Sequence, residues 1–468
     1  MDYKGLDYLR SRLDSKRPYV LKRYNYYDMD DGMDTQILSN LPPKLQNQEK
    51  YVGWIPRSVD TLVNKLKFNG FGNDDVFNLT KIFNMNNKDV LFKSMFKGAI
   101  ISSCDFIYIS KNTDGSVRLE VIDGANGTGI LDNSTMLLTE GYAVIERDPE
   151  TGNPIEEAYF TENATYFYKN NEGEPYQVFK NDAPYPLLVP VIYNSDATRP
   201  FGRSHITKSL MTYVEDVKTT LVLMAISSLF YSFPQRYALG LNITKKVDDD
   251  DEEDYEDEDV GQTEEEKAQS DKEFDSFKAA VSTMLAIERD RDGNIPTLGQ
   301  FPQQSMAPYN DQLKTYASLF AGETGMTPDD LGFTTEIPSS AEAIAAAHAT
   351  LQELANDAQD SFSVGIRNIG YLAKCVQDKR AYRRDEFAEI KIRWKPIYPI
   401  DASKMSALGD SIYKINEVVP GFITREIIED LTGLEGGSEE PSYKAPMNVR
   451  VQKPEDNEEG GNDDGLDS

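Results

Sequence analysis

Helical spacing of apolar residues dominates the second half of the chain. Apolar positions recur at intervals of three and four residues over about 203–232, 309–323 and 339–380, which predicts three long amphipathic helices. At ~1.5 Å per residue the third helix would be roughly 60 Å long, which exceeds the usual length of a globular helix. Gly365 and Gly370 are candidate bend points within it.

The first third of the chain instead alternates with a period of two. Two N-terminal segments, 2–27 and 57–69, have helical spacing, and Ser58 is the predicted N-cap of the second. Alternating segments on either side of turn-rich links predict three β-hairpins: 106–110 with 117–122, 142–146 with 155–160, and 165–169 with 176–180. These hairpins form an antiparallel sheet, which together with the helices predicts an α+β fold.

Shorter elements complete the pattern. Pro184, Pro186 and Pro190 are expected to interrupt the strands. The remaining predicted elements are strands over 235–243 and 389–397, a short strand within 288–301, a helix over 272–288 and a closing helix pair over 401–415 and 424–431.

Charge is concentrated in two segments. The chain has 468 residues, 49 Lys+Arg and 79 Asp+Glu, which gives a formal net charge of −30. Residues 248–266 contain 14 acidic residues and no base, and residues 435–468 contain ten acidic residues and three bases. Repulsion predicts that both segments are extended and solvated. The balance argues against a grip on duplex DNA by a basic face and against attraction to anionic membranes.

The sequence offers little from which to build a catalytic centre. Cys104 and Cys375 lie far apart and are expected to be buried, reduced thiols. His205 and His348 each stand near the start of a long helix, without the surroundings of a catalytic triad. One loop begins like an EF-hand, but Phe301 stands where the last ligand should be Glu. No metal, cofactor or enzymatic activity is expected, and an assembly or channel role is favoured.

Three segments resemble one known family. Residues 201–241 contain FGRS, a long apolar stretch and FYSFPQRYALG. Residues 284–332 contain GQF, PYNDQ and AGETG, and residues 338–344 read PSSAEAI. In this order and spacing the segments resemble the portal proteins of tailed siphophages. The resemblance covers about residues 1–435, and it is specific because the motifs occur together.

The resemblance implies a portal architecture: a ring, usually dodecameric, at one capsid vertex, through which DNA is pumped in and later leaves. It divides the chain into a wing (1–202), a first stem helix (203–232), a clip (233–304) with the acidic insert 248–266, a second stem helix (305–325), a tunnel loop (326–338), a kinked tunnel helix (339–380), a wing return strand (381–399), a short helical crown (400–434) and a disordered acidic tail (435–468).

Within this scheme the tunnel loop supplies the channel-lining candidates. No Lys or Arg occurs between 315 and 366. A ring of cations would hold the duplex through its phosphates, whereas a polar or acidic lumen lets DNA slide. The candidates for lining the channel are Thr334, Thr335, Glu336, Ser339 and Ser340.

The clip supplies the candidates for docking a head–tail adaptor. Its acidic run has two open interpretations: an electrostatic docking surface for the adaptor or another basic partner, or a solvated insertion that keeps rings soluble. The docking candidates are Arg236, Tyr237, Asp248, Asp251 and Glu253.

The expected partners follow from the resemblance: further copies of the chain, a terminase motor that supplies the ATP chemistry, the adaptor, major capsid and scaffold proteins, and double-stranded DNA without sequence specificity. The expected location is the virion vertex, after assembly in the host cytoplasm. The apolar stripes of the long helices are expected to pack against neighbouring copies in the ring. Another virion assembly protein, such as a scaffold or capsid component, and a hydrolase that uses acidic residues are the alternatives.

Overall fold

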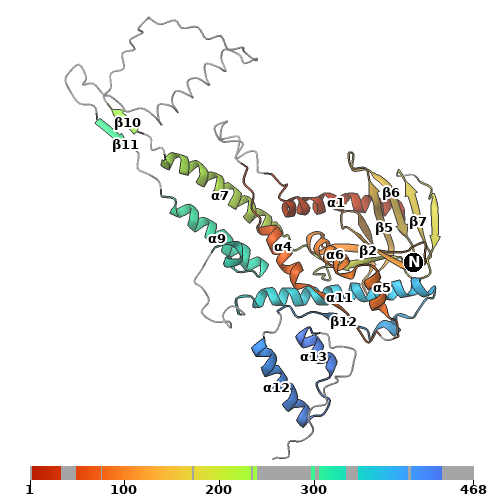
Figure 1. Cartoon of the computed structure of the whole chain (residues 1–468). Helices are drawn as coiled ribbons and strands as arrows, with labels where there is room; N and C mark the ends of the chain where they lie inside the picture. Colours follow the sequence, from red (N-terminus) through yellow and green to blue (C-terminus); the bar gives the residue numbers. More distant parts are fainter. Residues whose placement is uncertain are drawn as a thin grey trace, which may run out of the picture. The chain divides into compact units, whose positions relative to one another are not determined.

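The chain divides into two units. Unit 1 is Met1–Tyr398 and unit 2 is Pro399–Ser468. The predicted helix over 272–288, the acidic insert and the acidic tail lie outside the described residues. The computed structural model describes residues 3–32, 49–74, 76–170, 173–232, 236–239, 297–300, 305–333, 346–398 and 402–434 (Figure 1).

Unit 1 combines helices with antiparallel strands, so the predicted α+β fold is confirmed. Its helices are α1 (Leu6–Asp28), α4 (Trp54–Lys65), α5 (Leu79–Met85), α6 (Lys88–Ser102), α7 (Lys208–Ser232), α9 (Ala307–Thr324) and α11 (Ala349–Asp378), with the 3-10 helices η1 (Pro328–Leu331) and η2 (Arg384–Phe387). Its strands are β1 (Phe68–Gly72), β2 (Cys104–Lys111), β3 (Val117–Ile122), β4 (Gly127–Asp132), β5 (Leu137–Arg147), β6 (Pro154–Phe160), β7 (Ala164–Lys169), β8 (Gln177–Lys180), β9 (Leu188–Ile192), β10 (Arg236–Leu239), β11 (Thr297–Gln300) and β12 (Lys391–Trp394).

The three predicted hairpins are confirmed as β2–β3, β5–β6 and β7–β8. They belong to two sheets, a three-stranded sheet in the order β3-β2-β9 and a five-stranded sheet in the order β4-β5-β6-β7-β8. Two further ribbons pair β1 with β12 and β10 with β11.

Of the three prolines predicted to interrupt the strands, Pro184 and Pro186 lie between β8 and β9, but Pro190 lies within a strand. Leu188–Ile192 forms the buried strand β9, in which Pro190 lies opposite Phe106 of β2. Strand β9 is the edge of its sheet, and an edge strand tolerates a residue that lacks an N–H donor.

The predicted start of the second helix is also wrong. Helix α4 begins at Trp54 rather than near Ser58, because Trp54 and Ile55 are already buried in the core. The Ser58 hydroxyl is buried and donates to the carbonyl of Ile55 at 2.9 Å, so it does not cap the helix. Helix α4 ends at Lys65, and Phe68 begins strand β1.

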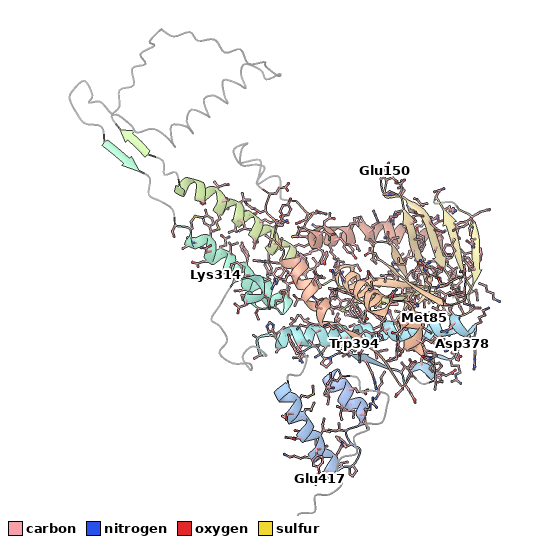
Figure 2. All side chains as sticks on the ribbon, in the orientation of Figure 1. Met85, Glu150, Lys314, Asp378, Trp394 and Glu417 are labelled. Atoms are coloured by element: carbon pink, nitrogen blue, oxygen red, sulfur yellow. The ribbon has the colours of Figure 1, made fainter. Side chains whose placement is uncertain are left out.

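Alternation along the central strands separates the core into layers. On β2, Ile107 and Ile109 pack into the main cluster with α6 and α11, whereas Phe106 faces the cluster shared with the five-stranded sheet. On β5, Ala143 joins that same cluster, while Tyr142 packs with α1 on the opposite face. The order is therefore helices, three-stranded sheet, five-stranded sheet and α1, and side chains fill the space between them (Figure 2).

Buried carboxylates hold α1 on the five-stranded sheet. Glu140 accepts the backbone N–H groups of Lys4 and Gly5 at 2.7 and 3.0 Å, ahead of the first helical turn. Glu157 is fully buried and pairs with the guanidinium of Arg10 at 2.7 Å. Both carboxylates have charged or N–H partners, which buried acidic groups require.

The two cysteines are buried and free, as predicted. Burial raises the pKa of Cys104 to about 12 and that of Cys375 to about 11, so both are thiols at neutral pH. None of the described helices is long and apolar enough to cross a membrane.

Unit 2 contains the predicted pair of helices, α12 (Ala402–Val418) and α13 (Arg425–Thr432). The side chain of Asn416 bonds both backbone groups of Ile423, at 2.9 and 3.0 Å, and so closes the turn between them. Tyr413, Val418 and Phe422 are exposed. This helical pair therefore leaves much of its apolar surface open to solvent.

Candidate functional site

Helices α7 and α9 form an antiparallel pair (Figure 1). At one end, the hydroxyl of Thr207, just before α7, donates to the carboxylate of Glu323 near the end of α9. Toward the other end, the hydroxyls of Ser227 and Tyr309 lie 2.8 Å apart. The PYNDQ and AGETG motifs thus supply the α9 partners at the two ends of the pair.

The ribbon β10–β11 lies between these helices in the chain. Arg236 and Tyr237 of β10 pair with Gln300 and Gly299 of β11 in antiparallel register. Of the strand predicted over 235–243, residues Arg236–Leu239 form β10, and the others lie outside the described residues. Of the docking candidates, Arg236 and Tyr237 are therefore on this ribbon, whereas the three acidic ones, Asp248, Asp251 and Glu253, lie outside the described residues.

The prediction that the apolar stripes face neighbouring copies is wrong for most positions. Leu210, Val214 and Val217 of α7 are buried within the chain itself. So is Phe320 of α9, whose ring meets Trp54 edge-to-face at 5.5 Å between centroids. Periodicity indicates that a face is covered but does not identify what covers it. Helix α11 is buried in the same way, at Leu351, Ala355, Ala358, Phe362, Ile366 and Ile369.

A buried ion pair ties the segment after α1 to α7, and the sequence analysis missed it. The ammonium group of Lys218 lies 2.6 Å from the carboxylate of Asp31 and donates to the carbonyl of Gly32 at 3.0 Å. Both side chains are nearly inaccessible to solvent, at 2% and 6% exposure. The sequence could have indicated this pair, because Lys218 lies next to Val217 in an apolar stripe. A lysine is rarely buried unless it has a charged partner.

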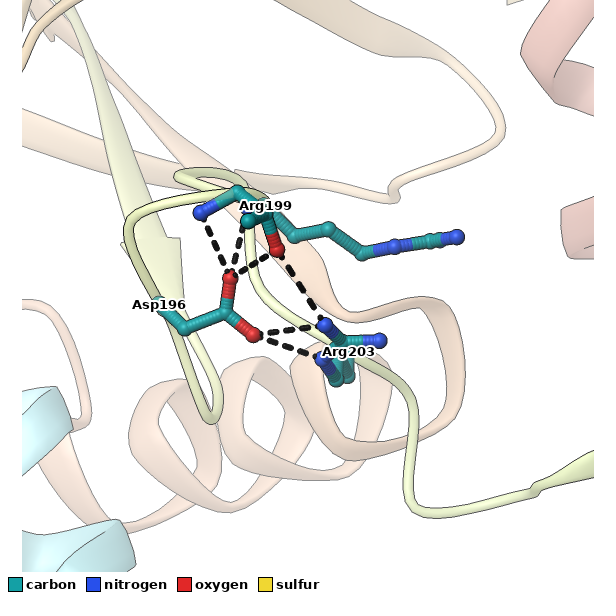
Figure 3. Close-up of polar contacts among 4 residues, drawn as sticks. Asp196, Arg199 and Arg203 are labelled. Atoms are coloured by element: carbon teal, nitrogen blue, oxygen red, sulfur yellow. Dashed lines mark hydrogen bonds and ion pairs between the residues drawn. The ribbon is translucent and has the colours of Figure 1, made fainter.

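The loop that precedes α7 is held together by its own polar contacts (Figure 3). The carboxylate of Asp196 accepts the backbone N–H groups of Thr198 and Arg199 at 2.8 and 2.7 Å. It also accepts the Nε of Arg203 at 2.8 Å. Hydrogen bonds from the Thr198 hydroxyl and from Arg203 hold the pKa of Asp196 well below its usual range.

The G-R-S motif continues this anchoring into the core. Gly202 has a φ of +76°, and a Cβ there would lie 2.0 Å from the carbonyl oxygen of Tyr193. The Ser204 hydroxyl donates to the carbonyl of Ile101 at 2.6 Å and accepts the N–H of Ile206 at 3.0 Å. Each residue of the motif therefore has a packing or hydrogen-bonding role.

His205 is buried at this junction, just before the start of α7. Its backbone N–H donates to the carbonyl of Ile100 at 2.9 Å, and its Nδ1 lies 3.4 Å from the hydroxyl of Tyr193. Its Nε2 has no partner in the part of the chain that the structure describes. Burial lowers the pKa of His205 to about 4, so the ring is neutral at pH 7.

The loop after α9 is partly ordered by its own side chains. Thr327 caps η1: its hydroxyl accepts the N–H of Asp330 at 3.3 Å, and the Asp330 carboxylate accepts the N–H of Thr327 at 2.9 Å. The same carboxylate is 3.8 Å from Nδ1 of His348, at the start of α11. The predicted loop over 326–338 thus contains a 3-10 helix. The channel-lining candidates Thr334, Thr335, Glu336, Ser339 and Ser340 lie outside the described residues.

Helix α11 has helical hydrogen bonding without a break from Ala349 to Asp378. The glycines predicted as bend points lie where other elements approach the helix. A Cβ at Gly365 would be 3.3 Å from the carbonyl oxygen of Pro190, and one at Gly370 would be 3.0 Å from Leu79. Both glycines therefore permit close packing of α11 against β9 and α5.

Comparison with known proteins gives matches over most of the chain. Residues 6–409 match the family model described as phage portal protein, SPP1 Gp6-like. The chain is 26% identical over 372 residues to the portal protein of Mycobacterium phage D29, covering 74% of this chain and 69% of that protein. It is also 26% identical over 343 residues to the portal protein of Mycobacterium phage L5, covering 70% of this chain and 65% of that protein.

Solved structures also align with the chain at low similarity. One is a chain from the virion of a native gene transfer agent particle, with 12% identity and a TM-score of 0.38, covering 82% of this chain and 90% of that one. Another, from the neck of a native gene transfer agent particle computed with C12 symmetry, has the same identity, TM-score and coverage.

We expect Gly202→Ala to destabilise the base of α7 more than Gly152→Ala. Both glycines have positive φ, at +76° and +70°, but the nearest atom to a Cβ at Gly152 is 3.9 Å away, against 2.0 Å at Gly202. Both substitutions pay the cost of placing alanine at a positive φ, so the difference between their destabilisations measures the steric overlap of the new Cβ with the carbonyl oxygen of Tyr193. It should be at least about 2 kcal/mol in the free energy of unfolding, measured by denaturant titration. Equal losses would contradict the proposed role of Gly202.

We expect His205 to make the fold less stable in mild acid. The unfolded histidine titrates near ~6.5, and burial lowers the folded pKa to about 4. Between these pH values the unfolded state therefore binds one more proton than the folded state. The stabilisation from the neutral, buried ring is fully present above pH ~6.5 and is lost as the pH falls toward 4, which lowers the free energy of unfolding by about 3 kcal/mol in total. Denaturant titrations across this range should show a steeper pH dependence for the wild-type chain than for His205→Gln. The same slope in both would refute the assignment.

Proposed function

Because the chain belongs to the phage portal protein family described as SPP1 Gp6-like, which covers residues 6–409, we propose that it forms a closed ring at one capsid vertex through which double-stranded DNA enters and leaves the head. Family membership does not favour the alternative of a scaffold or capsid component. A ring of identical subunits is expected to be closed and symmetric, and we propose the dodecamer usual for portals.

The antiparallel α7–α9 pair is the observation that carries this proposal. One end of the pair is fixed to the core through Ser204 and His205, and the chain beyond the other end makes the ribbon β10–β11. We assign α7 and α9 to the stem and residues 233–304 to the clip. The sheets with α1, α4, α5 and α6 form the wing, which β12 re-enters by pairing with β1. Helix α11 is the tunnel helix, and α12 with α13 is the crown.

The tunnel loop is proposed to line the narrowest part of the channel with polar and acidic groups. Its candidates, Thr334, Thr335, Glu336, Ser339 and Ser340, follow η1 and precede α11 in a stretch that lacks Lys and Arg between 315 and 366. Such a surface contacts DNA sterically and neutralises few phosphates, so the duplex can slide.

The clip is proposed to dock the head–tail adaptor. Arg236 and Tyr237 lie on β10, and the acidic insert with Asp248, Asp251 and Glu253 joins β10 to β11 in the chain. A run with eleven acidic residues in twelve positions would attract a basic partner surface over a screened range of about 10 Å.

The role proposed is structural rather than enzymatic. A separate terminase would supply the ATP chemistry for packaging, and capsid and scaffold proteins would surround the ring during assembly in the host cytoplasm. In the finished virion the ring would stay at the vertex, between head and tail.

Ring formation can be tested at the exposed apolar positions of the stem. Leu223 and Leu319 remain 42% and 47% exposed, and we propose that neighbouring subunits cover them. Leu319→Glu should raise the concentration needed for rings at least about tenfold, because a charge replaces a buried apolar contact. Negative-stain imaging and mass measurement of the purified chain would record this. Ser318→Glu, at the adjacent exposed position, is the matched control; equal effects of the two would reject this interface.

Channel lining can be tested by charge reversal in the tunnel loop. Thr335→Lys with Glu336→Lys should reduce packaged DNA at least about tenfold, because a ring of cations would retain phosphates. Rings should still form. Thr151→Lys with Glu150→Lys makes the same charge change at an exposed turn and should leave packaging unchanged. Normal packaging by intact rings of the first variant would remove these residues from the channel.

A further inference from the structure

Lysines that are distant in the sequence meet around the ribbon β1–β12. The strands pair so that Gly72 lies opposite Lys391 and Phe68 opposite Trp394. Ile392 and Trp394 pack against the core, so the alternating residues Lys391, Arg393 and Lys395 are on the outer face (Trp394 is labelled in Figure 2). The backbone N–H of Lys395 donates to the carbonyl of Lys67 at 2.9 Å and so extends the pairing beyond β12.

A cavity of about 240 Å³ lies beside this ribbon. Lys67, Lys93 and Lys395 line it, together with Asn64 and one carboxylate, Asp89. Its apolar lining residues are all buried, so the cavity presents ammonium groups above an apolar floor. The apolar residues are Val63, Leu66, Phe68 and Phe92.

The local charge has the opposite sign to the whole chain. Residues 65–67, 88–93 and 391–395 contain seven cationic residues and one acidic residue, a net charge of +6 in a chain of −30. With the other described residues, Lys67, Lys93, Lys391 and Lys395 form no ion pair. A local excess of positive charge raises the electrostatic potential and attracts an external polyanion.

We propose that this lysine surface, formed by Lys67, Lys93, Lys391, Arg393 and Lys395, binds the phosphate backbone of double-stranded DNA, separately from the channel-lining loop. The choice of DNA as the polyanion rests on the proposed function. Cations two residues apart on a strand are ~6.6–6.8 Å apart, about two steps of the ~3.4 Å phosphate rise along one strand of B-DNA.

The surface suits DNA better than an acidic protein partner. Protein interfaces depend on apolar or aromatic anchors near their centre. Here Phe68 and Phe92 are 6% and 3% exposed, so this surface presents no aromatic side chain of its own as an anchor. Flexible lysines, in contrast, are sufficient for contacts to phosphates that carry no sequence information. The binding is therefore expected to be independent of sequence and strongly salt-dependent.

The experiment measures binding of a short, labelled DNA duplex to the purified full chain at several salt concentrations, by fluorescence anisotropy. The test variant is Lys67→Gln, Lys93→Gln and Lys395→Gln together. Loss of three phosphate contacts should lower the slope of log affinity against log salt by about 2–3 and raise the Kd at least about tenfold at about 50 mM salt. A control variant, Lys22→Gln, Lys180→Gln and Lys314→Gln, removes three other exposed lysines and should change the Kd less than about twofold.

Wild-type affinity of the test variant, or equal losses in both variants, would overturn the proposal. Displacement of the duplex by polyglutamate at equal charge concentration would also overturn it, in favour of an acidic protein segment. Imaging each sample for rings separates this result from the portal assignment: wild-type chain that binds DNA through the lysine surface but never forms rings would contradict the proposed function alone.

Discussion

The carbonyl groups at the end of α6 fix the chain that leads from β9 into α7, and the position of the α7–α9 pair depends on them. The last turn of a helix leaves carbonyls without helical partners. Here Ile100 accepts the N–H of His205, Ile101 accepts the hydroxyl of Ser204, and Ser103 accepts the N–H of Tyr193. One helix end thus joins β9 to the start of α7. Because α9 is hydrogen-bonded to α7 near one end and to the residue before α7 at the other, these carbonyls help to position the α7–α9 pair.

The sequence pattern predicted the elements whose partners lie close together in the chain. The hairpins β2–β3, β5–β6 and β7–β8 were predicted because alternation and turn residues lie within a few positions of each other. The ribbon β1–β12 was not paired in advance, because its strands are more than three hundred residues apart. Strand β9 was missed because Pro190 argues against a strand, and only its place at a sheet edge makes that proline acceptable.

For the long helices, the spacing of apolar residues predicted which face is buried but not what covers it. Spacing correctly indicated that Val214 and Phe320 would be buried, but it assigned the covering surface to neighbouring copies, whereas the chain covers them itself. The motifs identified the family resemblance, and the structure gives several of their residues a packing or hydrogen-bonding role: Gly202 and Ser204 fix the chain just before α7. The predicted channel and acidic clip residues lie outside the described part of the chain, so their roles stay predictions.

Charge shows why a whole-chain count is a poor guide to a surface. The count of −30 argued against a grip on duplex DNA by a basic face, yet the fold gathers Lys67, Lys93 and Lys395 around one cavity. A protein through which DNA moves needs its phosphate-binding surfaces away from the surface along which the DNA slides, because every phosphate that it neutralises opposes movement of the DNA. The sequence separates the two: no cation lies between 315 and 366, where the channel loop is proposed. Lys67, Lys391 and Lys395, which form no ion pair with the other described residues, lie instead at the β1–β12 ribbon. On the proposed function, the distribution of cations, rather than their number, would therefore set where the chain holds DNA and where it lets DNA pass.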